Sequence, residues 1–309
     1  MTMAPAKRDF LSLLDLSPAE AREVFALTKT MKHEPKGRRT DVLRGRAVAI
    51  LLEKASTRTR VSFEVGVAQL GAQPVVLGIQ GSQLGRGEPL KDTARVLSRY
   101  CDAIVYRTSA TSRLKEMATF SSGPVINALS DDGHPVQVLC DVYTAEEALK
   151  TPITGKKVAF VGDCSSNMAR SWVEAAQLFD FELVLAGPEE FMPPKSELAR
   201  AGARVTKCHD PRAALAGVEI VNTDVWTSMG QEEEAEARLH ALAGWTVDDA
   251  TVARAAKGAI VLHCLPAHRG EEIAESTLEG AASRVWDQAE NRLHVQKGLL
   301  LWLLGVRTL

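Results

Sequence analysis

The sequence predicts an α/β fold made of two parallel-sheet domains. The chain has 309 residues, about twice the usual length of one domain, so two domains are expected. Short apolar runs alternate with helix-like segments along most of the chain, which is typical of parallel sheets. The alternation stops at residues 151–157, where Pro152 and Gly155 indicate a linker, and then begins again.

In the first half of the chain, each element is predicted from its apolar pattern and the turn residues beside it. Strands are expected at residues 47–53, 73–78, 102–108 and 123–129. Helices are expected at residues 59–71 and 92–100. On the first of these helices Val61, Val65 and Ala68 share one face, and Gly71 is placed to end the helix.

The second half of the chain repeats this alternation. Strands are expected at residues 157–163, 181–187, 218–226 and 259–265. Helices are expected at residues 167–179 and 195–202. The acidic segment 231–238 is expected to be a solvated helix face or a mobile loop.

Composition excludes several classes of protein. With 37 basic and 39 acidic residues the net charge is −2, so a generally basic protein that binds nucleic acid or membrane surfaces is not expected. No uncharged apolar run approaches the ~20 residues of a membrane span, and the first residues do not resemble a secretory signal. The five cysteines are odd in number and none lies in a CxxC motif, which argues against a disulfide framework or a zinc site. A soluble cytoplasmic protein is therefore expected.

The first segment that carries chemistry is Glu53–Arg60, between a predicted strand and a predicted helix. Its backbone N–H groups and hydroxyls would lie at a helix N-terminus, where anions bind. Two arginines within this short segment suit a phosphate dianion. A helix cap with surface arginines explains the segment equally well. Arg60 is the weaker candidate, because it points away from Arg58 and could form only an ion pair.

Two further side chains follow predicted strands in the first half. Arg107 lies at the end of one strand and His134 follows another, and parallel α/β sheets bind ligands at the carboxyl ends of their strands. A single loop histidine is more often structural than catalytic. Together with Arg58, however, these residues would form a cationic pocket that could hold an anion and polarise a carbonyl.

The second half offers a different set of groups. Asn167 and Asp224 could hold the charged end of a small amino acid, although Asp224 could also be a turn residue. Cys264 could be a reactive thiol or an inert buried one, and Leu265–Pro266 is a candidate cis peptide. A nicotinamide-dependent dehydrogenase is disfavoured, since the segment 162–171 lacks the GxGxxG motif.

Several motifs, in a fixed order, support a more specific interpretation. The chain contains STRTR at residues 56–60, HPVQ at 134–137, DVWTSMG at 224–230 and HCLPAHRG at 263–270. With these motifs the sequence resembles the ornithine branch of the aspartate/ornithine transcarbamylase family over nearly its whole length. The first two motifs are shared by carbamoyl phosphate enzymes, and the last two are specific to the ornithine branch.

The resemblance implies that each domain binds one substrate and that the active site lies in the cleft between the two domains. Residues 1–146 would bind carbamoyl phosphate, and the C-terminal helix at about 291–309 would pack back on this domain. Residues 147–290 would bind L-ornithine. The implied reaction transfers the carbamoyl group to the ornithine δ-amine and gives citrulline and phosphate, a step of arginine biosynthesis. The implied assembly is a homotrimer whose subunits share their sites.

The resemblance also assigns roles to residues. Those implied to contact carbamoyl phosphate are Ser56, Thr57, Arg58, Thr59, Gln83 from a neighbouring subunit, Arg107, His134, Gln137, Cys264, Leu265 and Arg292. Those implied to bind ornithine are Asn167, Asp224, Ser228 and Met229. The catalytic set would be Arg107, His134, Asp224 and Cys264. No metal or organic cofactor is expected, because carbamoyl phosphate is already activated.

Three features depart from the family pattern: Ala55, the segment 165–167 (Ser-Ser-Asn), which replaces a segment often richer in asparagine, and Arg170. Ala55 stands where proline is frequent, and Arg170 stands where a smaller or neutral residue is usual, so Arg170 could touch the ornithine pocket or pair with an acid.

Three alternative functions compete with this interpretation. The acceptor could be another amine, such as N-acetylornithine or putrescine. Aspartate ranks lower, because it would require additional cations. A catalytically silent regulatory paralogue would have lost Arg58, His134, Asp224 or Cys264, and all four are present.

Overall fold

The computed structural model describes residues 7–33, 40–227 and 232–307, and it divides into two compact units. Unit 1 comprises Met1–Leu139 and Arg292–Leu309, and unit 2 comprises Cys140–Asn291. Each unit contains one sheet in which all strands are parallel. The predicted fold class of two parallel-sheet α/β domains is thus confirmed.

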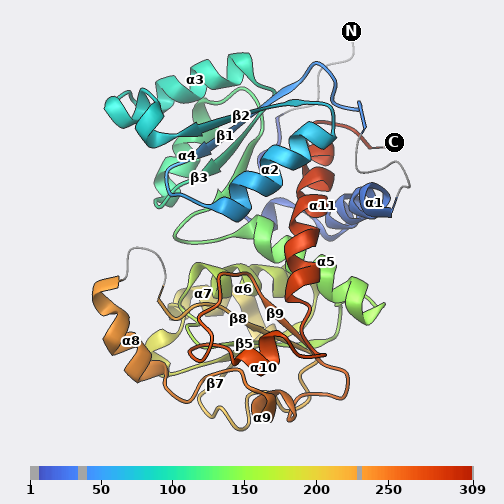
Figure 1. Cartoon of the computed structure of the whole chain (residues 1–309), viewed down its shortest axis with the longest axis vertical. Helices are drawn as coiled ribbons and strands as arrows, with labels where there is room; N and C mark the ends of the chain where they lie inside the picture. Colours follow the sequence, from blue (N-terminus) through green and yellow to red (C-terminus); the bar gives the residue numbers. More distant parts are fainter. Residues whose placement is uncertain (1–6, 34–39, 228–231, 308–309) are drawn as a thin grey trace. The chain divides into compact units, whose positions relative to one another are not determined.

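Unit 1 has a four-stranded sheet in the order β2-β1-β3-β4 (Figure 1). The strands are β1 (Ala47–Leu52), β2 (Gln73–Gly78), β3 (Ala103–Arg107) and β4 (Val125–Leu129). The helices are α1 (Pro18–His33), α2 (Thr57–Gln69), α3 (Leu90–Tyr100) and α4 (Thr111–Phe120). Apolar side chains of α3 and α4 pack with β1 and β3 on one face of the sheet, and α2 packs on β1 and β2. The central strands are buried on both faces, which is why they read as continuous apolar runs.

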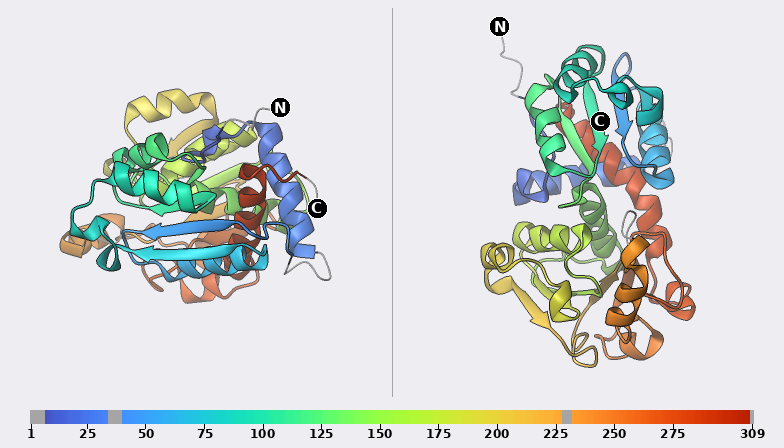
Figure 2. Two further views of the ribbon diagram at one scale, coloured as in Figure 1. Left: turned by 90° about the horizontal axis from the view of Figure 1, so that it is seen from above. Right: turned by 90° about the vertical axis from the view of Figure 1, so that its left-hand side faces the viewer.

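Two long helices pass from one unit to the other along the chain. They are α5 (Pro135–Leu149) and α11 (Val285–Leu303). The C-terminal half of α11 lies beside α1 in both views of Figure 2, and the indole of Trp302 donates to Glu23 at 2.7 Å. Lys297, completely buried, donates to Gln69 of α2 at 2.9 Å. These contacts join the end of the chain to unit 1.

Unit 2 has a five-stranded sheet in the order β7-β6-β5-β8-β9. The strands are β5 (Lys157–Val161), β6 (Glu182–Ala186), β7 (Val205–Cys208), β8 (Ile220–Thr223) and β9 (Ile260–His263). The helices are α6 (Asn167–Phe179), α7 (Lys195–Ala201), α8 (Ala235–Leu242), α9 (Asp249–Val252) and α10 (Glu275–Leu278). On one face the core is formed by Val161, Val221 and Val261, on which Trp226 and Trp245 pack.

The structure refines two expectations about local elements. Helix α2 ends before Gly71 as predicted, and Gly71 adopts a φ of +82°. The face that Val61 and Val65 share is not the core face, however. Their side chains are 50% and 39% exposed, and Phe63 and Val67 are the residues that pack into unit 1. In the acidic segment 231–238, α8 begins at Ala235, and residue 231 lies outside the described residues.

Two properties of the described residues concern membrane spans and disulfide bonds. None of the helices in the described part of the chain combines the length and apolar composition that a bilayer crossing requires. All five cysteines lie among the described residues, and each is a free thiol.

Candidate active site

The segment between β1 and α2 has the features of an anion site. Ser56 is the N-cap of α2, and its hydroxyl accepts a hydrogen bond from the backbone N–H of Thr59 at 3.3 Å. Thr57 and Arg58 are exposed in the first turn, where helix N–H groups lack intrahelical partners. Arg60 forms an ion pair with Glu64 one turn on, at 3.3 Å, so its expected structural role is confirmed.

The end of β3 brings Arg107 to this helix N-terminus. The guanidinium Nη1 of Arg107 donates to the hydroxyl of Thr59 at 3.3 Å, and both side chains are buried. The pairing of β3 with β4 shifts register between Tyr106 and Arg107, as in a β-bulge. Such irregularities redirect side chains near active sites.

His134 and Gln137 extend the same half-site at the start of α5. Gln137 accepts a hydrogen bond from Arg292 of α11, and all three side chains are buried. Burial, together with the positive charges of Arg292 and Arg107, lowers the pKa of His134 well below its usual value. A neutral imidazole among two guanidiniums can polarise a carbonyl without adding a third positive charge.

The lowered pKa of His134 predicts how stability depends on pH. The unfolded chain takes up a proton at this residue below about pH 6.5, and the folded chain resists it, so stability is complete above pH 6.5 and falls as the pH decreases. We expect His134→Gln to remove part of this acid sensitivity. The measurement is the denaturation midpoint of both proteins at pH 7.5 and 5.5. Parallel declines of wild type and variant would contradict the prediction.

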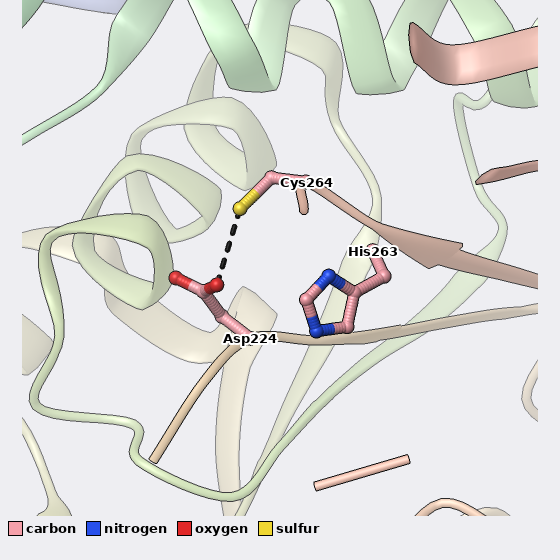
Figure 3. A group of neighbouring side chains, drawn as sticks. All are labelled: Asp224, His263 and Cys264. Atoms are coloured by element: carbon pink, nitrogen blue, oxygen red, sulfur yellow. Dashed lines mark hydrogen bonds between the residues drawn. The ribbon is translucent and has the colours of Figure 1, made fainter. Parts of the chain in front are cut away.

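The ornithine half-site predicted in unit 2 lies at the ends of two adjacent strands. Thr223 of β8 pairs with His263 of β9, so the next residues, Asp224 and Cys264, leave the sheet side by side. Figure 3 shows the thiol of Cys264 directed at the carboxylate of Asp224, to which it donates at 3.1 Å. Burial raises the pKa of Asp224, which the neighbouring His263 and the thiol partly oppose.

The side chain of His263 is fixed behind this pair. Its Nδ1 accepts from the backbone N–H of Leu265 at 2.9 Å, so its Nε2 carries the proton and donates to Glu272, also at 2.9 Å. Leu265 adopts a φ of +60°, which is unusual for a leucine, and the Leu265–Pro266 bond is cis as expected. The segment after β9 is therefore held in one conformation.

The remaining predicted residues lie in separate places. Asn167 is half-buried and is the first residue of α6, after the N-cap Ser166. Arg170 pairs with Glu197 at 3.5 Å, which supports the second of its two expected roles. Gln83 is exposed in unit 1, and a single chain does not test its contact with a neighbouring subunit. Ser228 and Met229 lie outside the described residues.

Among the described residues, two groups of side chains could hold a metal ion. They are Asp224, His263 and Cys264, and His268, Glu271 and Glu272, and in each group the ligand atoms lie within 4.8 Å of one another. In the first group both nitrogens of His263 and the thiol of Cys264 already form hydrogen bonds within the protein. A metal ion would have to displace these bonds.

Sequence reasoning missed two acidic residues beside the site. Glu272 is completely buried and holds His263, and the carboxylate of Glu53 holds three side chains around the end of β3. The sequence did contain a signal for Glu53, because an acidic side chain directly after a buried strand needs hydrogen-bond or charge partners. Glu272, in a run of two glutamates, has no such signal.

Comparison with known proteins shows which family these half-sites belong to. Residues 8–147 match the carbamoyl-P binding domain of aspartate/ornithine carbamoyltransferases, and residues 154–303 match the Asp/Orn binding domain. The chain belongs to the aspartate/ornithine carbamoyltransferase family. The resemblance found in the motifs is thus confirmed.

Individual relatives are similar over their whole length. An ornithine carbamoyltransferase of Sorangium cellulosum is 68% identical over 308 residues, covering 97% of this chain and 99% of the relative. That of Pelobacter propionicus is 49% identical over 96% of this chain and 99% of its own. Among solved structures, the ornithine carbamoyltransferase from Pyrococcus furiosus has a TM-score of 0.91 at 41% identity, covering 98% of this chain and 99% of that one.

Proposed function

We propose that the protein is an enzyme that transfers the carbamoyl group of carbamoyl phosphate to the δ-amine of L-ornithine, releasing L-citrulline and phosphate. The observation that carries this proposal is the Cys264–Asp224 hydrogen bond at adjoining strand ends, in a chain of this family. An anionic carboxylate beside a thiol suits an amino acid with an ammonium group. The relatives named above are ornithine carbamoyltransferases, which agrees with this acceptor.

Unit 1 would bind carbamoyl phosphate. The N-terminus of α2, with the hydroxyls of Ser56 and Thr57 and the guanidinium of Arg58, would hold the phosphate. Arg107, which reaches Thr59 at this helix N-terminus, would donate both to the phosphate and to the carbamoyl oxygen, and His134 would donate to the carbamoyl oxygen. Gln137 and Arg292, which are hydrogen-bonded to each other, would close the other side of this half-site.

Unit 2 would bind ornithine. Asp224 would pair with the α-ammonium group, Asn167 would bind at the start of α6, and Ser228 and Met229 would contribute from the DVWTSMG motif. Cys264 and Leu265 would lie where the two substrates meet. The transfer requires the amine to reach the carbamoyl carbon, so both substrates must be bound at the same time.

The chemistry needs positioned charges more than a cofactor. The δ-amine of ornithine has a pKa of about 10.4 in water, so it must lose a proton before it attacks the carbonyl carbon. Asp224 and Cys264 would orient the amine and handle that proton. Thr59, Arg107 and His134 would stabilise the oxyanion of the tetrahedral intermediate, and Arg58 would hold the departing phosphate.

A direct assay tests this function and its alternatives. Purified protein is given carbamoyl phosphate with ornithine, N-acetylornithine, putrescine or aspartate, and the carbamoylated product is measured. Strong preference for ornithine supports the proposal. Preference for another amine would retain the carbamoyl phosphate half-site and reject the acceptor assignment, and no turnover with any amine would indicate a silent regulatory paralogue.

Replacing Cys264 with alanine tests the division between the half-sites. We expect catalytic efficiency with ornithine to fall about tenfold or more, because a hydrogen bond to a charged group is lost, while binding of inorganic phosphate stays near wild type. Steady-state kinetics and calorimetric phosphate titration provide the two readouts. Cys208→Ala, at β7 on the opposite edge of the same sheet, is the matched control. Equal loss of both functions in Cys264→Ala would contradict this division.

The proposal also includes the setting of the enzyme. We propose a homotrimer in the cytoplasm, acting in arginine biosynthesis, with the substrate domains divided near residue 146 as predicted from the sequence. Apolar side chains exposed on α2 and α3 support a subunit contact, namely Val61, Val65, Val96 and Tyr100. The five free thiols are compatible with a reducing compartment. Mass measurement in solution tests the assembly.

A further inference from the structure

The carboxylate of Glu53, directly after β1, is shared by three side chains. Its Oε1 accepts from the hydroxyl of Tyr106 and from Arg113, at 3.0 Å from Nε and 2.6 Å from Nη2. Its Oε2 accepts from the hydroxyl of Thr108 at 2.6 Å. Burial alone would raise the pKa of Glu53, but these hydrogen bonds outweigh burial and lower it.

Two of these partners are the residues on either side of Arg107. Tyr106 belongs to β3, and Thr108 follows Arg107, the last residue of the strand. Because successive side chains of an extended chain point to opposite sides, Tyr106 and Thr108 lie on the side opposite Arg107. Tyr106 packs with α3 and α4, whereas Arg107 reaches Thr59 of α2. Glu53 therefore binds the end of β3 on the side opposite the side chain of Arg107.

The backbone is irregular at this same point. The register with β4 shifts between Tyr106 and Arg107, and beyond the shift the backbone N–H of Thr108 donates to the carbonyl of Leu129 at 3.1 Å. On the other side, the backbone N–H of Glu53 donates to the carbonyl of Arg107 at 2.9 Å. Glu53 thus contacts Arg107 through its backbone and both neighbours of Arg107 through its side chain.

We infer that Glu53 is a positioning residue for Arg107, aiming its guanidinium at the carbamoyl phosphate half-site without touching the substrate. This inference rests on the proposed function. The Glu53 side chain is 8% exposed, so water does not readily replace it when it is removed. Without the carboxylate, Tyr106 and Thr108 lose their common acceptor. The backbone hydrogen bonds at the end of β3 remain, but the side chains on either side of Arg107 are no longer fixed, so its guanidinium is held less firmly against Thr59.

A double-mutant cycle separates positioning from a general structural role. The readout is the dissociation constant for inorganic phosphate, measured by calorimetry on the full chain, in wild type, Glu53→Ala, Arg107→Ala and the double variant. We expect Glu53→Ala to weaken phosphate binding about tenfold when Arg107 is present, and to have almost no further effect when it is absent. An equal weakening in both backgrounds, or none in either, would overturn the inference.

Two further variants keep the inference testable if Glu53→Ala fails to fold. Tyr106→Phe and Thr108→Val each remove one hydrogen bond to Glu53 with little change in volume, and each should show the same dependence on Arg107 in the cycle. Arg113→Gln is the control. The Arg113 side chain is partially exposed and is not adjacent to Arg107 in the sequence, so this substitution should change phosphate binding least. An effect of Arg113→Gln as large as that of Tyr106→Phe would overturn the inference.

The cycle also distinguishes this inference from the proposed function. Phosphate binding does not require turnover. If the wild type forms no citrulline, but the effect of Glu53→Ala on phosphate binding still depends on Arg107, the proposed function is rejected and the role of Glu53 is kept. If the wild type turns over ornithine but the effects of Glu53→Ala and Arg107→Ala on phosphate binding simply add, the proposed function is kept and the role of Glu53 is rejected. A wild type that binds no phosphate would reject both.

Discussion

Arg58→Ala is expected to lower kcat/KM for carbamoyl phosphate by about 10²- to 10³-fold while leaving the free energy of unfolding unchanged. The guanidinium would contact the phosphate at the N-terminus of α2, and its charge is needed most as phosphate departs. Arg58 is exposed, and within the described part of the chain it forms no ion pair or side-chain hydrogen bond. The substitution should therefore remove a ligand contact and almost nothing else.

Arg60→Ala is the matched control for this prediction. Arg60 lies on the same helix two residues on, is also exposed, and pairs with Glu64 at 3.3 Å, an exposed pair worth about 0–1 kcal/mol. Its removal should leave both kinetics and stability near wild type. Initial rates with varied carbamoyl phosphate at saturating ornithine measure both variants. Equal losses in the two variants would show that the segment needs only general positive charge, and a normal Arg58→Ala enzyme would remove Arg58 from the mechanism.

The sequence predicted most elements of the fold because parallel strands buried on both faces leave a clear apolar signal. The strand β5 and the helix α6 were found in this way, and α6 has the predicted bounds. Strand β7 was missed, since it is a short edge strand in which Thr206 and Lys207 are exposed. Without two buried faces, such a segment has no continuous apolar run to recognise.

Prediction of the candidate site from the sequence was also incomplete. Motifs identify residues that would touch ligands, and strand ends explain why Arg107 or Asp224 lies at a sheet edge. Motifs do not say which side chains hold those residues in place. The hydrogen bonds of Glu53 to Tyr106 and of Glu272 to His263 depend on tertiary contacts. The exposed face of α2 shows a related limit, because an apolar stripe on a helix does not reveal whether the chain's own core or another surface covers it.

Arg238→Ala is expected to cost unit 2 about 3–5 kcal/mol of stability. The guanidinium of Arg238 forms a buried ion pair with Asp163, and its Nε donates to the carbonyl of Trp226 at 2.6 Å. The same group stacks over the ring of Phe191 at 4.9 Å. Removing Arg238 leaves the carboxylate of Asp163 buried without its counter-charge, which is the costly way to break such a pair. Denaturant unfolding followed by tryptophan fluorescence measures the loss.

The matched control for Arg238→Ala is an exposed pair in the same unit. Arg204 and Asp180 lie 2.5 Å apart with side chains 49% and 63% exposed, so Arg204→Ala should cost no more than about 1 kcal/mol. A double variant, Asp163→Asn with Arg238→Met, should recover part of the loss, since it removes the stranded charge. Similar losses in Arg204→Ala and Arg238→Ala would contradict the argument from burial.

The Asp163–Arg238 pair also connects stability to the proposed ornithine half-site. The second oxygen of Asp163 accepts from the backbone N–H of Ser165 at 2.9 Å and from its hydroxyl at 2.5 Å, and this turn leads directly into Asn167. On the other side, Arg238 holds the carbonyl of Trp226, two residues after Asp224. Arg238→Ala should therefore raise the KM for ornithine under conditions where the protein remains folded, and it should leave phosphate binding by unit 1 unchanged. A KM for ornithine equal to that of wild type would limit the pair to a role in stability.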